Sequence, residues 1–316
     1  METLKRTLVC ALLIIIMILT GCRPNNKSDY NRNSLVAALN LDCQVSINND
    51  GAVNVIDKTR GSGFDFSDWQ DIKSVSASEV QLGAIKVDGS VVMTGYPGFV
   101  MDLTDWKDID MLEFTDFAAY GLKEDGTIIF QNVDDSQVDE TVNETVKVWR
   151  DISYIDTGFQ AIVGVTKNGK VVASVPQFPD LEKRVNQWED IKMVSISNNF
   201  FGRARIVAVK NNGEIVEERY EESEIIKYDL ESYEDLKGAV KICAGDYFTA
   251  GLMPDGTLKV RCGLDYDKRL MSEVEGEFLD LRNLDNTKDV ADINSFEDIL
   301  VVLKNDGTIL VGGFED

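Results

Sequence analysis

The sequence predicts an all-β fold, a seven-bladed β-propeller. Three observations lead to this prediction: an Asn-Gly or Asp-Gly turn that recurs seven times, apolar residues at matching distances on both sides of each turn, and the absence of long helical patterns. A repeat of roughly 40 residues cannot bury both faces of its own sheet, so neighbouring repeats must stack. Four-stranded sheets in a ring of roughly 4 to 8 blades are the usual solution.

Seven glycines mark the turns, and each of them directly follows an asparagine or an aspartate. Such a pair between two apolar runs is the strongest short-range signal of a β-hairpin. The last position of a three-residue loop adopts a left-handed backbone, which glycine accepts without steric cost. We therefore interpret these glycines as structural and not as part of a phosphate-binding loop. They are Gly51, Gly89, Gly126, Gly169, Gly213, Gly256 and Gly307.

The apolar residues beside each turn fix the loop length, because they face each other only across a three-residue loop. A two-residue loop would shift the register by one residue and turn half of these side chains to the other face of the sheet. The expected first pairs are Ile47 with Val53, Ile85 with Val91, Leu122 with Ile128, Val165 with Val171, Val209 with Ile215, Leu252 with Leu258, and Leu303 with Ile309. The expected second pairs include Val45 with Val55, Tyr120 with Phe130, and Val301 with Val311.

A third β-rich segment precedes each hairpin, and the motif Trp-x-Asp-Ile stands before several of these segments. Softened fifth and sixth copies are Tyr233-Glu-Asp-Leu236 and Thr287-Lys-Asp-Val290. One aromatic residue per repeat at a fixed offset is typical of packing between units, and the alternative is an aromatic cage for sugars or cations. Six linking segments serve seven hairpins, so we expect one blade to lack a strand. The four tryptophans are Trp69, Trp106, Trp149 and Trp188.

The N-terminal residues carry a targeting signal. Lys5 and Arg6 precede an apolar run from Leu8 to Leu19, which is short for a membrane-spanning helix of about 20 apolar residues. The tetrad LTGC that ends this region resembles a bacterial lipoprotein box, with Cys22 as the lipid attachment site. We expect residues 1–21 to be a signal peptide, 22–34 a lipidated tether and 35–316 the propeller. The alternative is an uncut N-terminal anchor, and both place the chain at a bacterial cell membrane, outside the cytoplasm.

Composition excludes several kinds of site. A net charge of −23 disfavours nucleic acids and anionic lipid surfaces as partners. The chain has no histidine, which excludes Ser-His-Asp and Cys-His nucleophiles and the usual zinc ligand sets. The acidic segment from Asn132 lacks the spacing of a calcium loop, and we interpret it as a charged surface loop. We expect no cofactor and no metal.

The mature chain has three further cysteines, Cys43, Cys243 and Cys262. Cys243 and Cys262 fall on the first and third strands of one blade. Strands two apart lie about 9.5 Å from each other, beyond the reach of a disulfide at about 7 Å. We therefore expect three thiols.

The segment AGDYFTAGLMPDGTLKVRCG, from Ala244 to Gly263, resembles the regulator-of-chromosome-condensation (RCC1-like) repeat in a divergent bacterial form. The resemblance extends from Leu35 to Phe314 and implies seven blades of RCC1-like repeats. Only this sixth unit has both the Ala-Gly before the hairpin and the closing glycine, and the family's usual histidine near Tyr247 is missing. The family includes nucleotide-exchange factors for small GTPases and a secreted β-lactamase inhibitor, but no motif here selects either target.

Two function classes remain open. The first is a lipid-anchored, non-enzymatic module that binds an extracytoplasmic protein or peptide through loops on a rigid ring. Three long acidic inserts, 132–148, 219–236 and 264–287, favour a partner with a basic surface. The second is a hydrolase or lyase that acts on cell-wall or extracellular polysaccharide through paired carboxylates, although 55 acidic residues single out no pair. A deep central pocket with two close carboxylates would favour the enzyme, and a flat acidic face the binding module.

Overall fold

A computed structural model describes residues 34–38, 43–48, 51–57, 64–134, 138–198, 202–221, 233–263, 280–296 and 298–313. All of them belong to one compact unit, residues 31–316. The predicted signal peptide, the predicted lipid attachment site Cys22 and nearly all of the predicted tether lie outside the described residues. So do residues 222–232 and 264–279, which make up most of the second and third acidic inserts.

Seven antiparallel sheets follow one another along the chain, each with three strands and with the second strand in the middle. The strands are β1 (Val36–Ala38), β2 (Cys43–Ile47) and β3 (Val53–Asp57); β4 (Ile72–Ala77), β5 (Gln81–Lys86) and β6 (Val91–Gly95); β7 (Ile109–Phe114), β8 (Ala118–Lys123) and β9 (Ile128–Asn132); β10 (Ile152–Gly158), β11 (Ala161–Thr166) and β12 (Val171–Ser174); β13 (Ile191–Asn198), β14 (Arg203–Lys210) and β15 (Ile215–Glu221); β16 (Lys241–Ala244), β17 (Phe248–Leu252) and β18 (Leu258–Cys262); and β19 (Val290–Phe296), β20 (Ile299–Lys304) and β21 (Ile309–Gly313).

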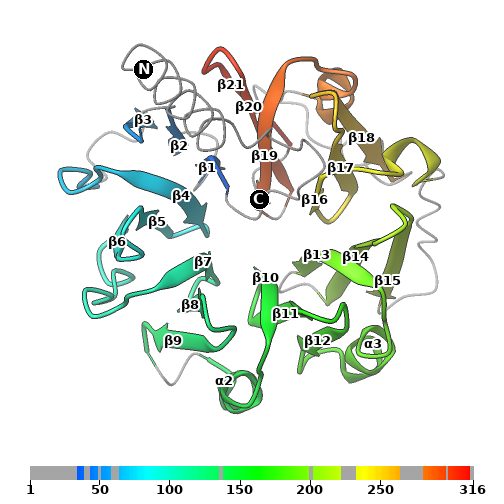
Figure 1. Cartoon of the computed structure of the whole chain (residues 1–316), viewed down its shortest axis with the longest axis horizontal. Helices are drawn as coiled ribbons and strands as arrows, with labels where there is room; N and C mark the ends of the chain where they lie inside the picture. The colour runs from blue at the N-terminus through cyan, green and yellow to red at the C-terminus, as the bar shows by residue number, and fades with distance from the viewer. Residues whose placement is uncertain are drawn as a thin grey trace, which may run out of the picture. The chain divides into compact units, whose positions relative to one another are not determined.

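The first strands of the seven sheets form a closed ring. Each contacts its neighbour in the order β1, β4, β7, β10, β13, β16 and β19, and β19 contacts β1 again (Figure 1). The ring therefore closes between the first and the last sheet by side-chain packing. The buried residues of this junction are Val36, Ala38, Ile299, Val301 and Leu303.

The predicted hairpin register is confirmed. All seven first pairs and the three second pairs named from the sequence are partners in the sheets. The loop has three residues, as the hairpin of the second sheet shows. There the Lys86 N–H donates to the Ser90 carbonyl at 2.8 Å, and the Gly89 N–H donates to the Lys86 carbonyl at 2.9 Å.

The turn glycines also join consecutive sheets. All seven have φ between +78° and +87°. Six of them accept a backbone hydrogen bond from the segment that links to the next sheet, as Gly126 does from the Ile152 N–H at 3.0 Å. A Cβ on Gly126 would lie 3.0 Å from backbone atoms of Ile152, whereas one on Gly307, in the last sheet, would meet nothing within 4 Å. Glycine therefore serves both the turn conformation and the close approach of the next link.

The expected number of strands is wrong in two ways for the described residues. Each sheet has the three strands that every repeat shows clearly, but the weaker fourth region of the repeat adds no strand to it; the first sheet is not short of a strand, because β1 supplies its first strand. Two helices lie against the outer strands of the third, fourth and fifth sheets, where a fourth strand would stand. Helix α2 (Glu140–Lys147) contacts β9 and β12, and helix α3 (Pro179–Val185) contacts β12 and β15.

The sequence did not predict these helices, and α2 lies within the first acidic insert, 132–148, directly after the segment interpreted as a charged loop. Asp139 caps α2 by accepting a hydrogen bond from the Thr141 N–H at 2.9 Å. Each helix buries two apolar residues four positions apart, which places them on one helical face. These residues are Val142 and Val146 in α2, and Leu181 and Val185 in α3.

The fifth linking segment is also assigned wrongly from the sequence. Tyr233–Leu236 forms a 3-10 turn, η1. Lys241 pairs with Leu252 in the sixth sheet as Met193 pairs with Val209 in the fifth, so Lys241 and Met193 occupy equivalent positions. Counting back from these two residues aligns Leu236-Lys-Gly-Ala239 with the motif Trp-x-Asp-Ile. Gly238 has φ +84°, and the aligned aspartates of the other links also have positive φ. The link therefore requires a left-handed residue at this position more than an aromatic residue two positions earlier.

The tryptophans pack inside the sheets. Trp69, Trp106 and Trp149 are buried, and Trp188 is half-buried. A Cβ on Gly121 in β8 would lie 2.7 Å from the ring of Trp106, so the strand glycine makes room for the indole. This arrangement supports the packing interpretation over an aromatic cage. Three cysteines of the described chain are thiols, and Cys243 and Cys262 lie on the first and third strands of one sheet as expected.

Candidate binding site at the centre of the ring

A cavity of about 50 Å³ lies among the first strands, and we call it the central pocket. Its walls come from β4, β7, β10, β13, β16 and β19, mainly from the carboxyl ends of these strands. Figure 1 shows β4 and β7 pointing their carboxyl ends toward the centre of the ring. The repeat itself therefore brings six strand ends together around one small volume.

One equivalent position in each first strand supplies the side chains at the centre. The pairing of the first strand with the second strand defines this position in every sheet. In six sheets the position lies five residues after the residue with positive φ in the preceding link, as Glu113 follows Asp108. All but the first of these residues line the central pocket. They are Ala37, Ser76, Glu113, Asp156, Ser195, Cys243 and Asn294.

Two of these residues, Glu113 and Asp156, are carboxylic acids on adjacent first strands. Ser76 Oγ donates to Glu113 Oε2 at 3.0 Å, and the Ile196 N–H donates to Asp156 Oδ2 at 2.8 Å. Burial raises the pKa of Glu113 above its usual range, and the negative charge of Asp156 raises it further. Burial also raises the pKa of Asp156, although its hydrogen bonds oppose this effect.

The cation nearest to this pair is already engaged. Lys241 Nζ lies 2.8 Å from Asp292 Oδ1 and donates to Ser34 Oγ at 2.9 Å. The other oxygen of Asp292 accepts a hydrogen bond from the Leu35 N–H at 2.5 Å. This buried ion pair connects the sixth, seventh and first sheets, so it helps to close the ring.

Several buried acceptor atoms around the pocket have no hydrogen-bond partner. The side chain of Asn198 is 3% exposed and lines the pocket; its Nδ2 donates to the Phe159 carbonyl at 2.5 Å, but its Oδ1 accepts nothing. Asp116 also lines the pocket, and its Oδ1 is buried without a partner. Burial, and then the charge of Glu79, raises the pKa of Asp116 to about 6, although hydrogen bonds from the Glu79 N–H and the Ser78 side chain oppose this effect. The pocket wall therefore has oxygen atoms that could accept further hydrogen bonds.

Half-buried aromatic side chains lie beside Asp116. The rings of Phe99 and Phe117 are 6.4 Å apart, and Phe117 is 6.4 Å from Phe159 with an interplanar angle of 75°. Phe117 and Phe159 belong to the loops that follow β7 and β10, so this aromatic row borders the pocket. Aromatic faces next to carboxylates suit a cationic or amphipathic group.

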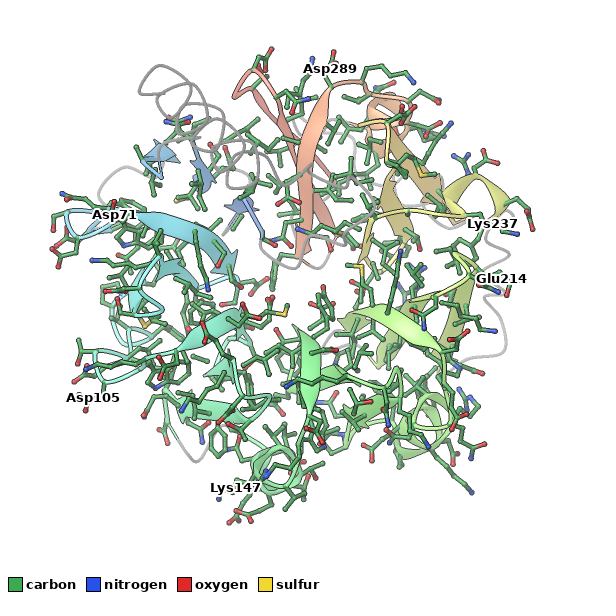
Figure 2. The ribbon with its side chains drawn as sticks, viewed as in Figure 1. Asp71, Asp105, Lys147, Glu214, Lys237 and Asp289 are labelled. Atoms are coloured by element: carbon green, nitrogen blue, oxygen red, sulfur yellow. The ribbon has the colours of Figure 1, made fainter. Side chains whose placement is uncertain are left out.

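The rim of the ring, which we define as the seven turns and the links that follow them, has a different chemistry. Figure 2 shows Asp71, Glu214 and Asp289 at the outer edge of the ring. Aspartates of the turns bind their own loops, as where Asp125 Oδ1 accepts from the N–H and the hydroxyl of Thr127 at 2.9 and 2.6 Å. These two bonds lower the pKa of Asp125. The predicted turn glycines thus belong to loops whose polar side chains form hydrogen bonds within the same loop.

Sequence reasoning did not find Glu113, Asp156 or Asn198. Aligning the repeats on the aspartate of Trp-x-Asp-Ile and reading five residues further on would have shown both carboxylates, because this position carries a charge only in the third and fourth sheets. No group of three or more potential ligands in the described part of the chain is placed to hold a metal ion. None of the described helices has the length and apolar character needed to span a bilayer.

No family model and no curated protein matches the sequence. Solved structures do match. The CRINKLY WD40 ectodomain of the receptor kinase ACR4 from Arabidopsis thaliana is 8% identical with a TM-score of 0.61, over 89% of this chain and 95% of that chain. The entire ectodomain of the receptor kinase CR4 from Physcomitrella patens is 9% identical with a TM-score of 0.57, over 89% of this chain and 73% of that chain.

A structure of Kap60 bound to yeast RCC1 (Prp20) also matches, at 12% identity and a TM-score of 0.47, over 84% of this chain and 73% of that chain. Identities this low show the fold alone. Together with the seven sheets, the ectodomain likenesses confirm the expected fold, a seven-bladed β-propeller.

Proposed function

We propose that this protein is a lipid-anchored, non-enzymatic propeller that binds a protein or peptide with a basic surface outside the cytoplasm. The observation that carries the proposal is the central pocket with its border: carboxylates, unpartnered acceptors and an aromatic row meet where six strand ends converge. A net charge of −23 adds long-range attraction for a basic partner. The fold also occurs in the ectodomains of two plant receptor kinases.

The binding proposal is tested by capture with matched variants. Full-length chain in detergent is immobilised and incubated with extracytoplasmic proteins of the source organism. Asp116→Asn/Phe117→Ser changes the border of the pocket, and Val87→Ser/Asp88→Asn changes an adjacent apolar-acidic pair on the rim, where Val87 is 70% exposed. The proposal predicts that the first variant loses the captured protein at least about tenfold, equivalent to about 1.4 kcal/mol, while the second retains it. Equal capture by both variants would contradict it.

The anchoring part of the proposal depends on Cys22, which follows an apolar run and the residues LTG. Labelled palmitate supplied to cells should enter the wild-type chain and fail to enter a Cys22→Ser variant. A Cys22→Ser chain that keeps its label, or a wild-type chain with an intact N-terminus, would support an uncut anchor instead.

A second candidate, the carboxylate-dependent hydrolase or lyase, draws support from Glu113 and Asp156, since two carboxylates share the central pocket. The raised pKa of Glu113 would suit a general acid. However, the pocket volume of about 50 Å³ is far below the roughly 300–1,000 Å³ of ligand pockets, so a sugar ring does not fit. Release of oligosaccharides from cell-wall glycans by the wild type, and not by Glu113→Gln, would establish this candidate over the binding module.

A further inference from the structure

The charges at the centre do not balance. Glu113 and Asp156 line the central pocket together with Lys241, whose positive charge acts on both carboxylates, and Lys241 is itself paired with Asp292. The ammonium group of Lys241 donates hydrogen bonds to Asp292 and Ser34 instead. Two carboxylates therefore remain without a paired cation in a poorly solvated site, and such a site favours either their protonation or the entry of a positive group.

The hydrogen-bonding capacity points the same way. Asn198 Oδ1 and Asp116 Oδ1 are buried acceptors without partners, and both residues belong to the wall of the pocket. Asn198 Oδ1 lies against Gly158, another wall residue, where an added Cβ would come within 1.9 Å of it. Buried acceptors without partners cost free energy, and a ligand that donates several hydrogen bonds removes that cost. An anion or an ether would add acceptors to a site that already has too many.

The size of the pocket limits the ligand to a small group. About 50 Å³ accommodates roughly three or four water molecules. That is close to the four heavy atoms of a guanidinium, and more than an ammonium needs. A guanidinium offers five N–H donors in one plane, which suits two carboxylates on neighbouring strands.

We propose that the central pocket binds one guanidinium or alkylammonium group, held between Glu113 and Asp156 with Asn198 as a neutral acceptor. This inference rests on the proposed function and deepens it, because a lysine or arginine side chain of the partner would supply the group. The aromatic row of Phe117 and Phe159 would then contact the aliphatic part of that side chain at the entrance. A free small amine has the same chemistry and is the other possible source.

The test uses the full-length chain in detergent and three cations of equal charge. Methylguanidinium and methylammonium carry N–H donors, whereas tetramethylammonium carries none. We expect methylguanidinium to bind in a saturable manner by calorimetry, and tetramethylammonium to bind at least about tenfold more weakly, because it cannot satisfy the acceptors. Binding of all three with equal affinity, or of none, would overturn the inference.

Matched variants locate the site. Glu113→Gln keeps the size of the side chain and can still accept the bond from Ser76, whereas Asp88→Asn removes an equal charge from the rim. We expect Glu113→Gln to weaken methylguanidinium at least about tenfold and Asp88→Asn to leave it unchanged. Circular dichroism of Glu113→Gln checks that the variant is folded, and Asp156→Asn repeats the test at the second carboxylate. Equal loss in the rim variant would show nonspecific attraction and overturn the site.

Proton release provides a further readout. A carboxyl group that is protonated in the empty pocket must lose its proton when the cation binds, so the cation should bind more tightly as pH rises. The charged groups acting on Glu113 are Asp156 from β10 and Lys241 from β16, and Ser76 from β4 is neutral. Affinity that is independent of pH between 5 and 9 would contradict binding between these carboxylates.

A pair of peptides shows whether the cation comes from a protein side chain or from a free amine. It also distinguishes failure of the pocket inference from failure of the proposed binding function. A peptide with one arginine should bind more tightly than methylguanidinium, and its citrulline analogue should not bind. If free amines bind and peptides and captured proteins do not, the pocket inference stands and the protein-binding function fails. If a protein is captured at the pocket border but Glu113→Gln leaves its affinity unchanged, the function stands and the inference fails.

Discussion

The rim and the central pocket of the same ring use polar residues in opposite ways. On the rim, the polar groups recur from sheet to sheet and are satisfied locally, as by the bonds from Thr127 to Asp125. At the centre, equivalent positions carry different residues, and buried acceptors such as Asn198 Oδ1 are left without partners. Polar groups of the rim thus specify the fold, whereas the unpartnered acceptors of the centre cost stability, and a ligand that donates hydrogen bonds would remove that cost.

The largest effect is expected at Arg205, a buried residue that connects the fifth sheet to the pocket side of the sixth. Its Nε lies 2.9 Å from Glu217 Oε1, and its other nitrogens donate to the Phe248 carbonyl at 2.7 Å and to Thr249 Oγ1 at 2.6 Å. Arg205→Met removes the buried charge paired with Glu217, although Arg219 Nη2 remains 2.8 Å from Glu217 Oε1, and it also removes the hydrogen bonds to Phe248 and Thr249. Together these losses should cost about 3–5 kcal/mol of unfolding free energy. Urea denaturation measures this loss.

Arg184 is the matched control for Arg205, because it forms an exposed pair with Glu218 at 2.7 Å. Arg184→Met should cost less than about 1 kcal/mol. If both arginine variants lose the same stability, burial does not make the contacts of Arg205 more important for stability than the exposed pair of Arg184 and Glu218.

The next effect isolates the contact between rim turns and links. Gly126→Ala and Gly307→Ala both place alanine at positive φ, +87° and +86°. The backbone strain alone should cost about 1–2 kcal/mol in each. Gly126→Ala should lose additional stability because its Cβ would crowd backbone atoms of Ile152, while Gly307 faces open space. Thermal unfolding of the two variants compares them directly, and equal losses would mean that the turns do not join the sheets.

A smaller effect, opposite in sign, is expected at the centre. The folded pKa of Glu113 is raised above its ordinary value of 4.5, so the residue destabilises the fold increasingly as pH rises from about 4.5 through the folded pKa. Glu113→Gln should therefore be more stable than the wild type at pH 8, by more than about 1 kcal/mol, and equally stable near pH 4. Melting temperatures across this range test it, with the exposed rim variant Glu124→Gln as control. A Glu113→Gln chain less stable than the wild type at pH 8 would give Glu113 a purely structural role.

The smallest effect is expected at an exposed rim aspartate. The folded pKa of Asp125 lies below its ordinary value of 3.8, so its contribution is present above that value and is lost as pH falls through the folded pKa. Asp125→Asn should lower the melting temperature slightly at pH 7 and not at pH 2. Asp105→Asn, which removes an equal rim charge outside the turns, is the control, and an identical pH response of the two variants would contradict the turn argument.

The sequence predicted the hairpins because their information is local: alternation of period two and a glycine that needs positive φ fix the register of each turn. It failed where tertiary contacts decide. Tyr233 resembles the tryptophan of the link, yet the left-handed backbone at Gly238 sets the true alignment. The pocket was missed for the same reason, since Glu113 and Asp156 are 43 residues apart in the chain and come together only when the third and fourth sheets pack against each other.

The division between a structural rim and a binding centre is tested most directly by hydrogen–deuterium exchange of the full-length chain with and without the captured protein. The account predicts slower exchange at residues 114–118 and 157–161, beside the pocket, and unchanged exchange at the rim turns 87–90 and 124–127. Slower exchange at the rim turns, with residues 114–118 and 157–161 unchanged, would contradict it.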